Sequence, residues 1–186
     1  MRERLYSKGL WLKRENIKNG HNNNTLMLLH GQFAHLQNFG LGNKATEYFR
    51  MINPIEHAKT KDEANKYKVE PYVIPGDVYG EGNLAGRGGW TWYTGSSSWM
   101  YQAGIEWILG LKIRNRELYL EPNISSEWKE YSIKYRYKDS IYNIRVRNPN
   151  GKTNGIDKFI LNGREIPEKK ILLDENGGNY DIEIEM

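Results

Sequence analysis

Helical periodicity occurs in three places in the first two thirds of the chain. Residues 43–52 have apolar side chains at helical spacing, with Asn43 as a candidate cap and Asn53-Pro54 as the end. A second short helix is predicted at 61–67, capped by Thr60. A third, largely buried helix is predicted up to Gly110, with its cap in Ser96-Ser97-Ser98. Its apolar positions are Trp99, Ala103, Ile105, Trp107, Ile108 and Leu109.

Beyond Gly110 the apolar period changes from helical to two. Residues 112–120, 131–137, 142–146 and 182–186 alternate, with turn signals at 148–151 and 161–164. This pattern predicts an antiparallel β-sandwich with one solvated face. Four cations are expected on that face: Lys134, Arg136, Arg145 and Arg147.

Composition narrows the class of protein. The chain has 186 residues and a net charge of +4, from 27 basic and 23 acidic side chains that are mixed along its length. This balance argues against a dedicated nucleic-acid surface. There is no cysteine, no long apolar run and no signal peptide at the start. We therefore expect a soluble, cytoplasmic protein with no membrane span.

The histidines do not predict a metal site. His21, His30 and His35 lie in one segment without an accompanying carboxylate, and His57 is expected to be structural.

Residues 86–100 combine glycines, hydroxyls and large aromatics immediately before the third helical pattern. Thr94 and Gly95 are placed at the positive end of that helix, where free backbone N–H groups and the helix dipole favour an anion, phosphate above all. The alternative is that residues 94–98 only cap the helix. The chain has 13 tyrosines and 6 tryptophans. Such residues occur both in protein cores and as flat apolar surfaces that bind sugar rings.

Several motifs resemble the C-terminal end of glycoside hydrolase family 94. These are Val69-Glu70-Pro71-Tyr72, Asp77-Val78-Tyr79, Gly86-Arg87-Gly88-Gly89-Trp90-Thr91-Trp92-Tyr93-Thr94-Gly95, Ile105-Glu106 with Ile108-Leu109-Gly110-Leu111, and Glu121-Pro122-Asn123-Ile124. The family contains inverting sugar phosphorylases and the C-terminal part of cyclic β-1,2-glucan synthase. The tryptophan-rich motif is most similar to the β-1,2-glucan branch. The resemblance extends from about Arg14 to Tyr137.

The resemblance implies a fold and a reaction. It implies that residues 1–111 are the C-terminal portion of an (α/α)6 six-hairpin barrel and that residues 112–186 are a jelly-roll-like β-sandwich domain. In the reaction, inorganic phosphate is the co-substrate, without any cofactor, and attacks the anomeric carbon of a β-linked glucose oligosaccharide to give α-glucose 1-phosphate.

Site residues carry over by position, Arg14 from an Arg-Glu-Asn triplet at residues 14–16 that resembles one in the family, and the others from the tryptophan-rich motif. Thr94 and Gly95 match the phosphate-binding Thr-Gly pair. Candidate substrate-binding residues are Arg14, Arg87, Trp90, Trp92 and Tyr93. The aspartate that serves as general acid belongs to a part of the family sequence that precedes this chain, so no catalytic residue is assigned.

Residues 21–39 depart from the family pattern. The family has there a Gly-Gln-Tyr-Thr-His-Ala-like motif, whose histidine binds phosphate. Residues 24–39 can be back-translated so that the same bases, read one position earlier, give a family-like helix. We therefore treat this segment as aberrant, with two compensating frame shifts and the true histidine codon straddling Leu26 and Met27. The DNA sequence tests this hypothesis.

The sequence is compatible with three functions. The first is a phosphorylase fragment that is inactive alone because the general acid is missing. The second is a non-catalytic carbohydrate-binding or interaction module. The third is a structural remnant that needs a partner, either the missing N-terminal part of the enzyme or a second copy, because an incomplete barrel exposes apolar helix faces.

Overall fold

The computed structural model describes residues 33–186 except 71, 77, 80–81 and 93. The chain divides into two compact units. The first, here the helical unit, comprises residues 1–34 and 48–102, and the second, here the sheet unit, comprises residues 35–47 and 103–186. Of the residues named above, the following lie outside the described residues: Arg14, His21, Leu26, Met27, His30, Pro71, Asp77 and Tyr93.

Short capped helices dominate the described part of the helical unit. The 3-10 helix η1 spans Pro54–His57, and its cap Asn53 accepts a hydrogen bond from the Ile55 amide through Oδ1 at 3.1 Å. Helix α4 spans Lys61–Tyr67, as the sequence predicts. A further 3-10 turn, η2, spans Gly82–Leu84.

Helix α4 is held at both ends. Thr60 Oγ1 accepts from the Glu63 amide at 3.2 Å, and Glu63 Oε2 accepts from the Thr60 amide at 2.9 Å. This reciprocal pair is a capping box, which satisfies two N–H groups that the helix itself leaves free. At the other end Lys68 adopts a left-handed φ of 55° and donates to the Ala64 carbonyl. Tyr67, the last helical residue, is thereby fixed in position.

Helix α3 spans Gly42–Ile52 and confirms the predicted helix. The expected cap was wrong, because Asn43 is the second residue of the helix. Its side-chain oxygen instead accepts a hydrogen bond from the Ser126 amide at 2.8 Å, across 83 positions of sequence. Gly42 permits this approach, since a Cβ there would lie 2.1 Å from the Ile124 carbonyl oxygen.

The third helix begins earlier than the serines suggested. Helix α5 spans Thr94–Gln102, so Ser96, Ser97 and Ser98 lie inside it. The winding then widens into a π-helical segment, η3, over Ala103–Ile108. Gly110, with a φ of 77°, ends the helical region directly against the Glu121 backbone.

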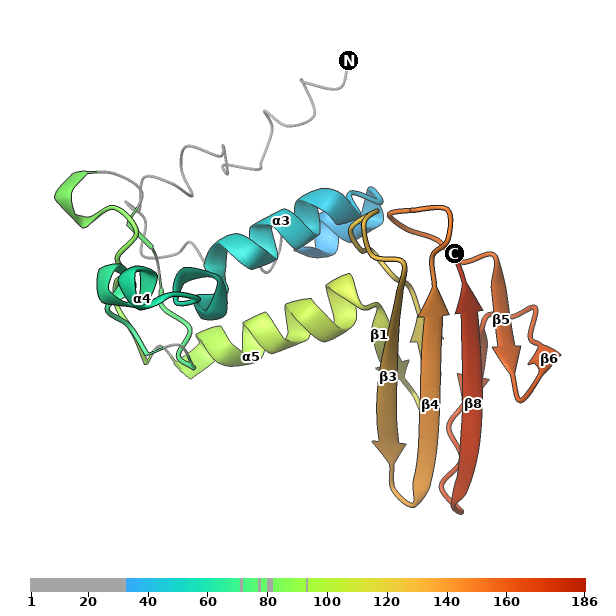
Figure 1. The fold of residues 1–186 in the computed structure, drawn as a ribbon. Helices are drawn as coiled ribbons and strands as arrows, with labels where there is room; N and C mark the ends of the chain where they lie inside the picture. Colours follow the sequence, from blue (N-terminus) through green and yellow to red (C-terminus); the bar gives the residue numbers. More distant parts are fainter. Residues whose placement is uncertain (1–32, 71, 77, 80–81, 93) are drawn as a thin grey trace. The chain divides into compact units, whose positions relative to one another are not determined.

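Two sheets make up most of the sheet unit (Figure 1). The three-stranded sheet has the order β1-β2-β7 and the five-stranded sheet the order β3-β4-β8-β5-β6. The bounds are β1 Leu111–Arg114, β2 Glu117–Leu120, β3 Glu130–Tyr137, β4 Ser140–Arg147, β5 Lys158–Leu161, β6 Arg164–Glu165, β7 Lys170–Leu172 and β8 Gly178–Glu185.

The strands confirm the predicted alternation of buried and exposed side chains, but one pair of strands departs from the predicted antiparallel pairing. Lys134, Arg136, Arg145 and Arg147 are exposed as predicted, while Ile144 on β4 and Ile182 on β8 are buried. Most neighbouring strands are antiparallel, but β4 and β8 pair in parallel, with Ile144 opposite Ile182. The expectation of purely antiparallel strands was wrong there, because residues 148–177 return the chain to the starting end of β4 before β8 begins.

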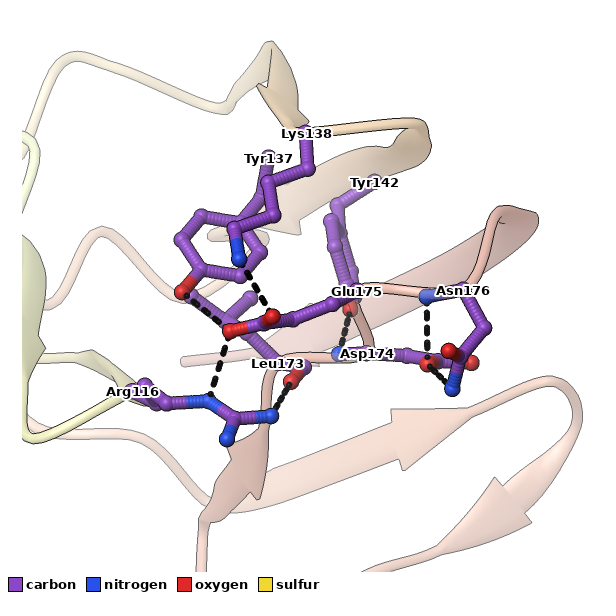
Figure 2. Close-up of polar contacts among 8 residues, drawn as sticks. All are labelled: Arg116, Tyr137, Lys138, Tyr142, Leu173, Asp174, Glu175 and Asn176. Carbon is purple, nitrogen blue, oxygen red and sulfur yellow. Dashed lines mark hydrogen bonds and ion pairs between the residues drawn. The ribbon is translucent and has the colours of Figure 1, made fainter.

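One carboxylate connects the turns of both sheets (Figure 2). Glu175, in the loop between β7 and β8, forms an ion pair with Arg116 Nε at 3.2 Å and accepts a hydrogen bond from the Tyr137 hydroxyl at 3.3 Å. Lys138 forms a third contact with it. Arg116 belongs to the β1–β2 turn, whereas Tyr137 and Lys138 belong to the end of β3 and its turn into β4. Glu175 therefore links the three-stranded and five-stranded sheets.

Candidate phosphate and sugar site

The start of α5 has the properties of an anion site. Thr94 is the first residue of the helix, and the first turn contains no acidic side chain. Gly95 is exposed, and a Cβ there would meet nothing nearer than Trp99 Nε1 at 3.8 Å. An anion can therefore approach the backbone N–H groups at this end of the helix closely.

Ser96 adds a feature that sequence reasoning missed. Its side chain is 2% exposed, and Oγ has no hydrogen-bond partner among the described residues. A buried hydroxyl is normally hydrogen-bonded, because leaving it unpaired costs about 1–3 kcal/mol. The serine run alone gives no signal that tells this buried hydroxyl from the exposed ones of Ser97 and Ser98.

The glycine-rich stretch before α5 is held by backbone hydrogen bonds. Val78 and Gly88 form an isolated antiparallel bridge, and residues 86–90, here the glycine ribbon, also bond to Gly76 and Tyr79. Tyr79 donates from its amide to the Arg87 carbonyl at 2.9 Å, and Gly76 donates to the Trp90 carbonyl at 2.6 Å. The ribbon thus has a defined backbone position rather than that of an unsupported loop.

The candidate sugar-binding aromatics are exposed on and beside this ribbon. Trp90 is 63% exposed and Trp92 is 68% exposed, and Arg87 is exposed as well. Trp92 has a φ of 62°, which is uncommon for a residue with a side chain and is a form of backbone strain that clusters at functional sites. All of these residues therefore lie in the helical unit. Arg87 and Trp90 are on the glycine ribbon, Trp92 follows it, and Thr94 and Gly95 begin α5.

The glycine ribbon contacts Tyr67, whose ring stacks on that of His57. The rings of His57 and Tyr67 are 5.1 Å apart and nearly parallel, at 16°. His57 Nε2 lies 2.8 Å from the Met51 carbonyl oxygen, to which it donates. This confirms the structural role predicted for His57. Tyr67, which sequence reasoning did not single out, is fully buried.

Two of the described ionisable side chains of the helical unit have shifted pKa values. The hydrogen bond from Lys59 Nζ at 2.6 Å holds the pKa of Glu56 below its usual value. A catalytic acid at neutral pH needs a raised carboxyl pKa instead. Burial raises the pKa of the Tyr67 phenol, which keeps it neutral.

The described residues include neither a metal-binding cluster nor a membrane-spanning helix. They contain no group of three or more His, Asp or Glu side chains placed to hold a metal ion. The described helices also include none with the length and apolar character needed to cross a membrane.

The comparisons with known relatives match these features to a family. Cyclic beta-(1,2)-glucan synthase NdvB of Rhizobium meliloti is 50% identical over 103 residues, which is 55% of this chain and 4% of that protein. Solabiose phosphorylase of Paenibacillus borealis is 28% identical over 148 residues, 79% of this chain and 19% of that protein. N,N'-diacetylchitobiose phosphorylase of Vibrio furnissii is 29% identical over 128 residues, 68% of this chain and 16% of that protein. The chain spans less than a fifth of the length of each of these relatives.

Two family models together cover most of the chain. Residues 111–153 match the model for the C-terminal domain of glycosyl hydrolase family 65. Residues 14–110, more than half of the chain, match the model for the catalytic domain of the glycosyl hydrolase 94 superfamily. This match includes the glycine ribbon and the start of α5 at Thr94 and Gly95. Because it covers more than half of the chain, the chain belongs to the glycosyl hydrolase 94 superfamily.

Proposed function

We propose that this chain supplies phosphate and sugar contacts for the inverting phosphorolysis of a β-glucan to α-glucose 1-phosphate. The observation that carries the proposal is the start of α5, where an exposed glycine and an acid-free first turn face solvent. The phosphorylases among the relatives support the reaction class, and the glucan synthase supports a β-linked glucan as the sugar.

In this proposal each group has a separate task. The backbone N–H groups of Thr94 and Gly95 bind and orient the phosphate, and Arg87 adds positive charge. The rings of Trp90 and Trp92 hold the sugar by contact with its apolar face. Positioning two reactants in this way removes much of the entropic barrier of a bimolecular step.

We further propose that the chain has little activity alone. The general acid of the family reaction has no assigned counterpart in this sequence, and protonation of the leaving sugar contributes about 10²–10⁴-fold to reactions of this type. The coverage of 19% of solabiose phosphorylase supports the placement of the acid elsewhere in a complete enzyme. In the same proposal α3 and α5 are helices of an (α/α)6 barrel, and the two sheets are the jelly-roll-like sandwich that follows it.

A binding module without catalysis is the second candidate. The specific observation in its favour is the number of large aromatics in the helical unit that are more than half exposed. They are Tyr72 at 76%, Trp90 at 63%, Trp92 at 68% and Tyr101 at 71%. Exposed rings of this size bind carbohydrate without any need for phosphate.

One set of measurements separates the two candidates. The purified chain is incubated with a β-1,2-linked gluco-oligosaccharide and inorganic phosphate, and glucose 1-phosphate is assayed, while calorimetry measures the binding of each compound. We expect binding of both and no turnover. Turnover would show that the chain is a complete catalyst, and sugar binding without phosphate binding would favour the module. Binding of neither compound by a folded chain would reject both functions.

A further inference from the structure

We propose that Tyr67 is a positioning residue that places the glycine ribbon, and that it thereby sets the sugar affinity of Trp90 and Trp92. This inference rests on the proposed function for the sugar, whereas the positioning itself is a property of the helical unit. Tyr67 lies outside the tryptophan-rich motif, more than twenty positions before Trp90.

Tyr67 is itself held rigidly. It is the last residue of α4, a helix closed by a capping box at Thr60 and by the left-handed Lys68. Its ring is 0% exposed and stacks on His57. His57 is the last residue of η1 and is held by its hydrogen bond to the Met51 carbonyl. Two separately capped helices therefore fix the two stacked rings.

Tyr67 contacts the centre of the glycine ribbon. Gly88 donates from its amide to the Tyr67 carbonyl at 2.9 Å. A Cβ at Gly88 would lie 3.0 Å from Tyr67 Cε2 and 2.3 Å from Val69 Cγ2. Glycine is therefore required for backbone and ring to approach this closely.

The glycine ribbon is held by two separate segments. Tyr79 bonds to Arg87 and Gly76 bonds to Trp90, while Tyr67 bonds to Gly88 between them. A displacement at Gly88 would therefore move the backbone of Trp90, whose carbonyl accepts from Gly76. Displacements of about 1 Å at a supporting position can reduce activity or binding severely.

The ring of Tyr67, and not its hydroxyl, makes the supporting contact. The Tyr67 hydroxyl has no hydrogen-bond partner among the described residues. The positioning must then come from the ring and the backbone carbonyl, both of which a phenylalanine would retain. This predicts that Tyr67→Phe keeps the function and that Tyr67→Leu loses it.

The test uses the full 186-residue chain and two matched pairs of variants. Gly88→Ala introduces the clash, whereas Gly76→Ala, at the residue that bonds to Trp90, places its Cβ 3.5 Å from the Trp90 carbonyl, an ordinary contact. Tyr67→Leu removes the ring, whereas Tyr67→Phe keeps it. Calorimetry gives Kd for a β-1,2-linked gluco-oligosaccharide and, separately, for inorganic phosphate.

We expect Gly88→Ala and Tyr67→Leu to raise the sugar Kd by about tenfold or more, and to raise the phosphate Kd by less, because of the proposed phosphate contacts only Arg87 lies on the glycine ribbon. Gly76→Ala and Tyr67→Phe should leave both constants within about twofold of the unmodified chain. A general loss of folding would instead weaken both ligands alike. Equal sugar affinity in Tyr67→Leu and Tyr67→Phe would overturn the proposal, as would an unchanged affinity in Gly88→Ala.

A second readout keeps positioning separate from sugar binding. Hydrogen exchange at the Gly88 amide should be faster in Tyr67→Leu than in Tyr67→Phe, whether or not any sugar binds. If the unmodified chain binds no sugar, the proposed function fails, and this exchange rate still decides whether Tyr67 holds the ribbon. Equal exchange rates would reject the positioning role. If Tyr67→Leu shows no cooperative melting, His57→Ala, compared with His57→Phe, repeats the comparison on the supporting ring.

Discussion

Arg116 and Glu175 lie 3.2 Å apart between Nε and Oε1, and they join the turn of the three-stranded sheet to the loop that leads into the five-stranded sheet (Figure 2). Lys138 and Tyr137 bind the same carboxylate from the other sheet. One side chain thus receives donors from two turns that are far apart in sequence. Neighbouring Asp174 receives the Tyr180 hydroxyl at 2.5 Å and the Asn176 amide at 2.9 Å, so the loop is held along its length.

This arrangement predicts a pH-dependent loss of stability. The hydrogen bond from Lys138, followed by the charge of Arg116, lowers the pKa of Glu175 from its usual 4.5. A carboxyl with a lower pKa in the folded state contributes stability above its unfolded pKa, and that contribution is lost as the pH falls through the folded pKa. Glu175→Gln should therefore lower Tm at pH 7, and the difference from the unmodified chain should shrink below about pH 4.

The matched control is Glu183→Gln, which makes the same change of charge on β8. The Glu183 side chain is exposed and forms no hydrogen bond or ion pair that involves another described residue. Thermal melting followed by circular dichroism at pH 7 and pH 3 checks the prediction. A Tm difference that is equal at both pH values, or as large in the control, would contradict it.

Gly42→Ala should destabilise the sheet unit, although alanine is the better helix former by about 1 kcal/mol. The new Cβ would lie 2.1 Å from the Ile124 carbonyl oxygen and 2.6 Å from that of Thr153, and backbone atoms cannot move aside as a flexible side chain can. We expect a loss of about 1–3 kcal/mol or more in the free energy of unfolding, measured by denaturant titration. Lys44→Ala, on an exposed position of the same helix, should change it by less than about 0.5 kcal/mol. A Gly42→Ala chain as stable as the unmodified one would show that the helix start can shift freely.

Gly95→Asp should separate the stability of α5 from its proposed anion binding. A negative charge in the first turn interacts favourably with the helix dipole and is worth about 0.3–1 kcal/mol. The same charge would repel phosphate, so we expect Tm to be kept or raised while the phosphate Kd rises about tenfold. Calorimetry at fixed ionic strength measures the affinity.

Gly95→Ala is the uncharged control for that position. Its Cβ has room, with Trp99 Nε1 at 3.8 Å as the nearest atom, and it should weaken phosphate less than the aspartate does. Equal phosphate affinity in the two variants would place the anion away from this helix end.

The sequence was sufficient wherever local chemistry decides the structure. Helix α4 follows from Thr60 and Glu63, which close a capping box within four residues. The turn at Asn162-Gly163 follows from two residues that tolerate a positive φ, here 48° and 79°. The alternation of β4 likewise predicted which side chains are buried.

The rest depends on contacts between distant segments. Alternation shows which face a strand buries but not which strand lies beside it, so the parallel β4–β8 pair had no local signal. Asn43 has the composition of a cap, but the Ser126 amide uses its side chain instead. For the candidate site, the motif located Thr94 and Gly95, and their roles stay predictions. The support from Tyr67 became visible only through its contact with Gly88.

Lys112 is the buried cation of the sheet unit whose loss should be most informative. Its Nζ lies 2.7 Å from Gln37 Oε1, 2.6 Å from Glu121 Oε2 and 4.9 Å from the centre of the Trp107 ring. The Lys112 side chain is 8% exposed, whereas that of Glu121 is 57% exposed. Lys112→Met keeps most of the aliphatic stem but removes all three contacts of the ammonium group.

We expect Lys112→Met to cost about 1–3 kcal/mol of the free energy of unfolding, because hydrogen bonds to a buried charge are worth more than exposed ones. Glu121→Gln should cost less than about 1 kcal/mol, since it removes only a partly exposed charge and keeps an oxygen acceptor. Denaturant titration gives both values. Hydrogen exchange should also become faster at residues 35–38 in Lys112→Met, since Gln37 would lose the contact that ties it to β1 from 75 positions away. If both variants lost the same stability, the ion pair with Glu121 alone would account for the effect, and the contacts with Gln37 and Trp107 would contribute nothing measurable.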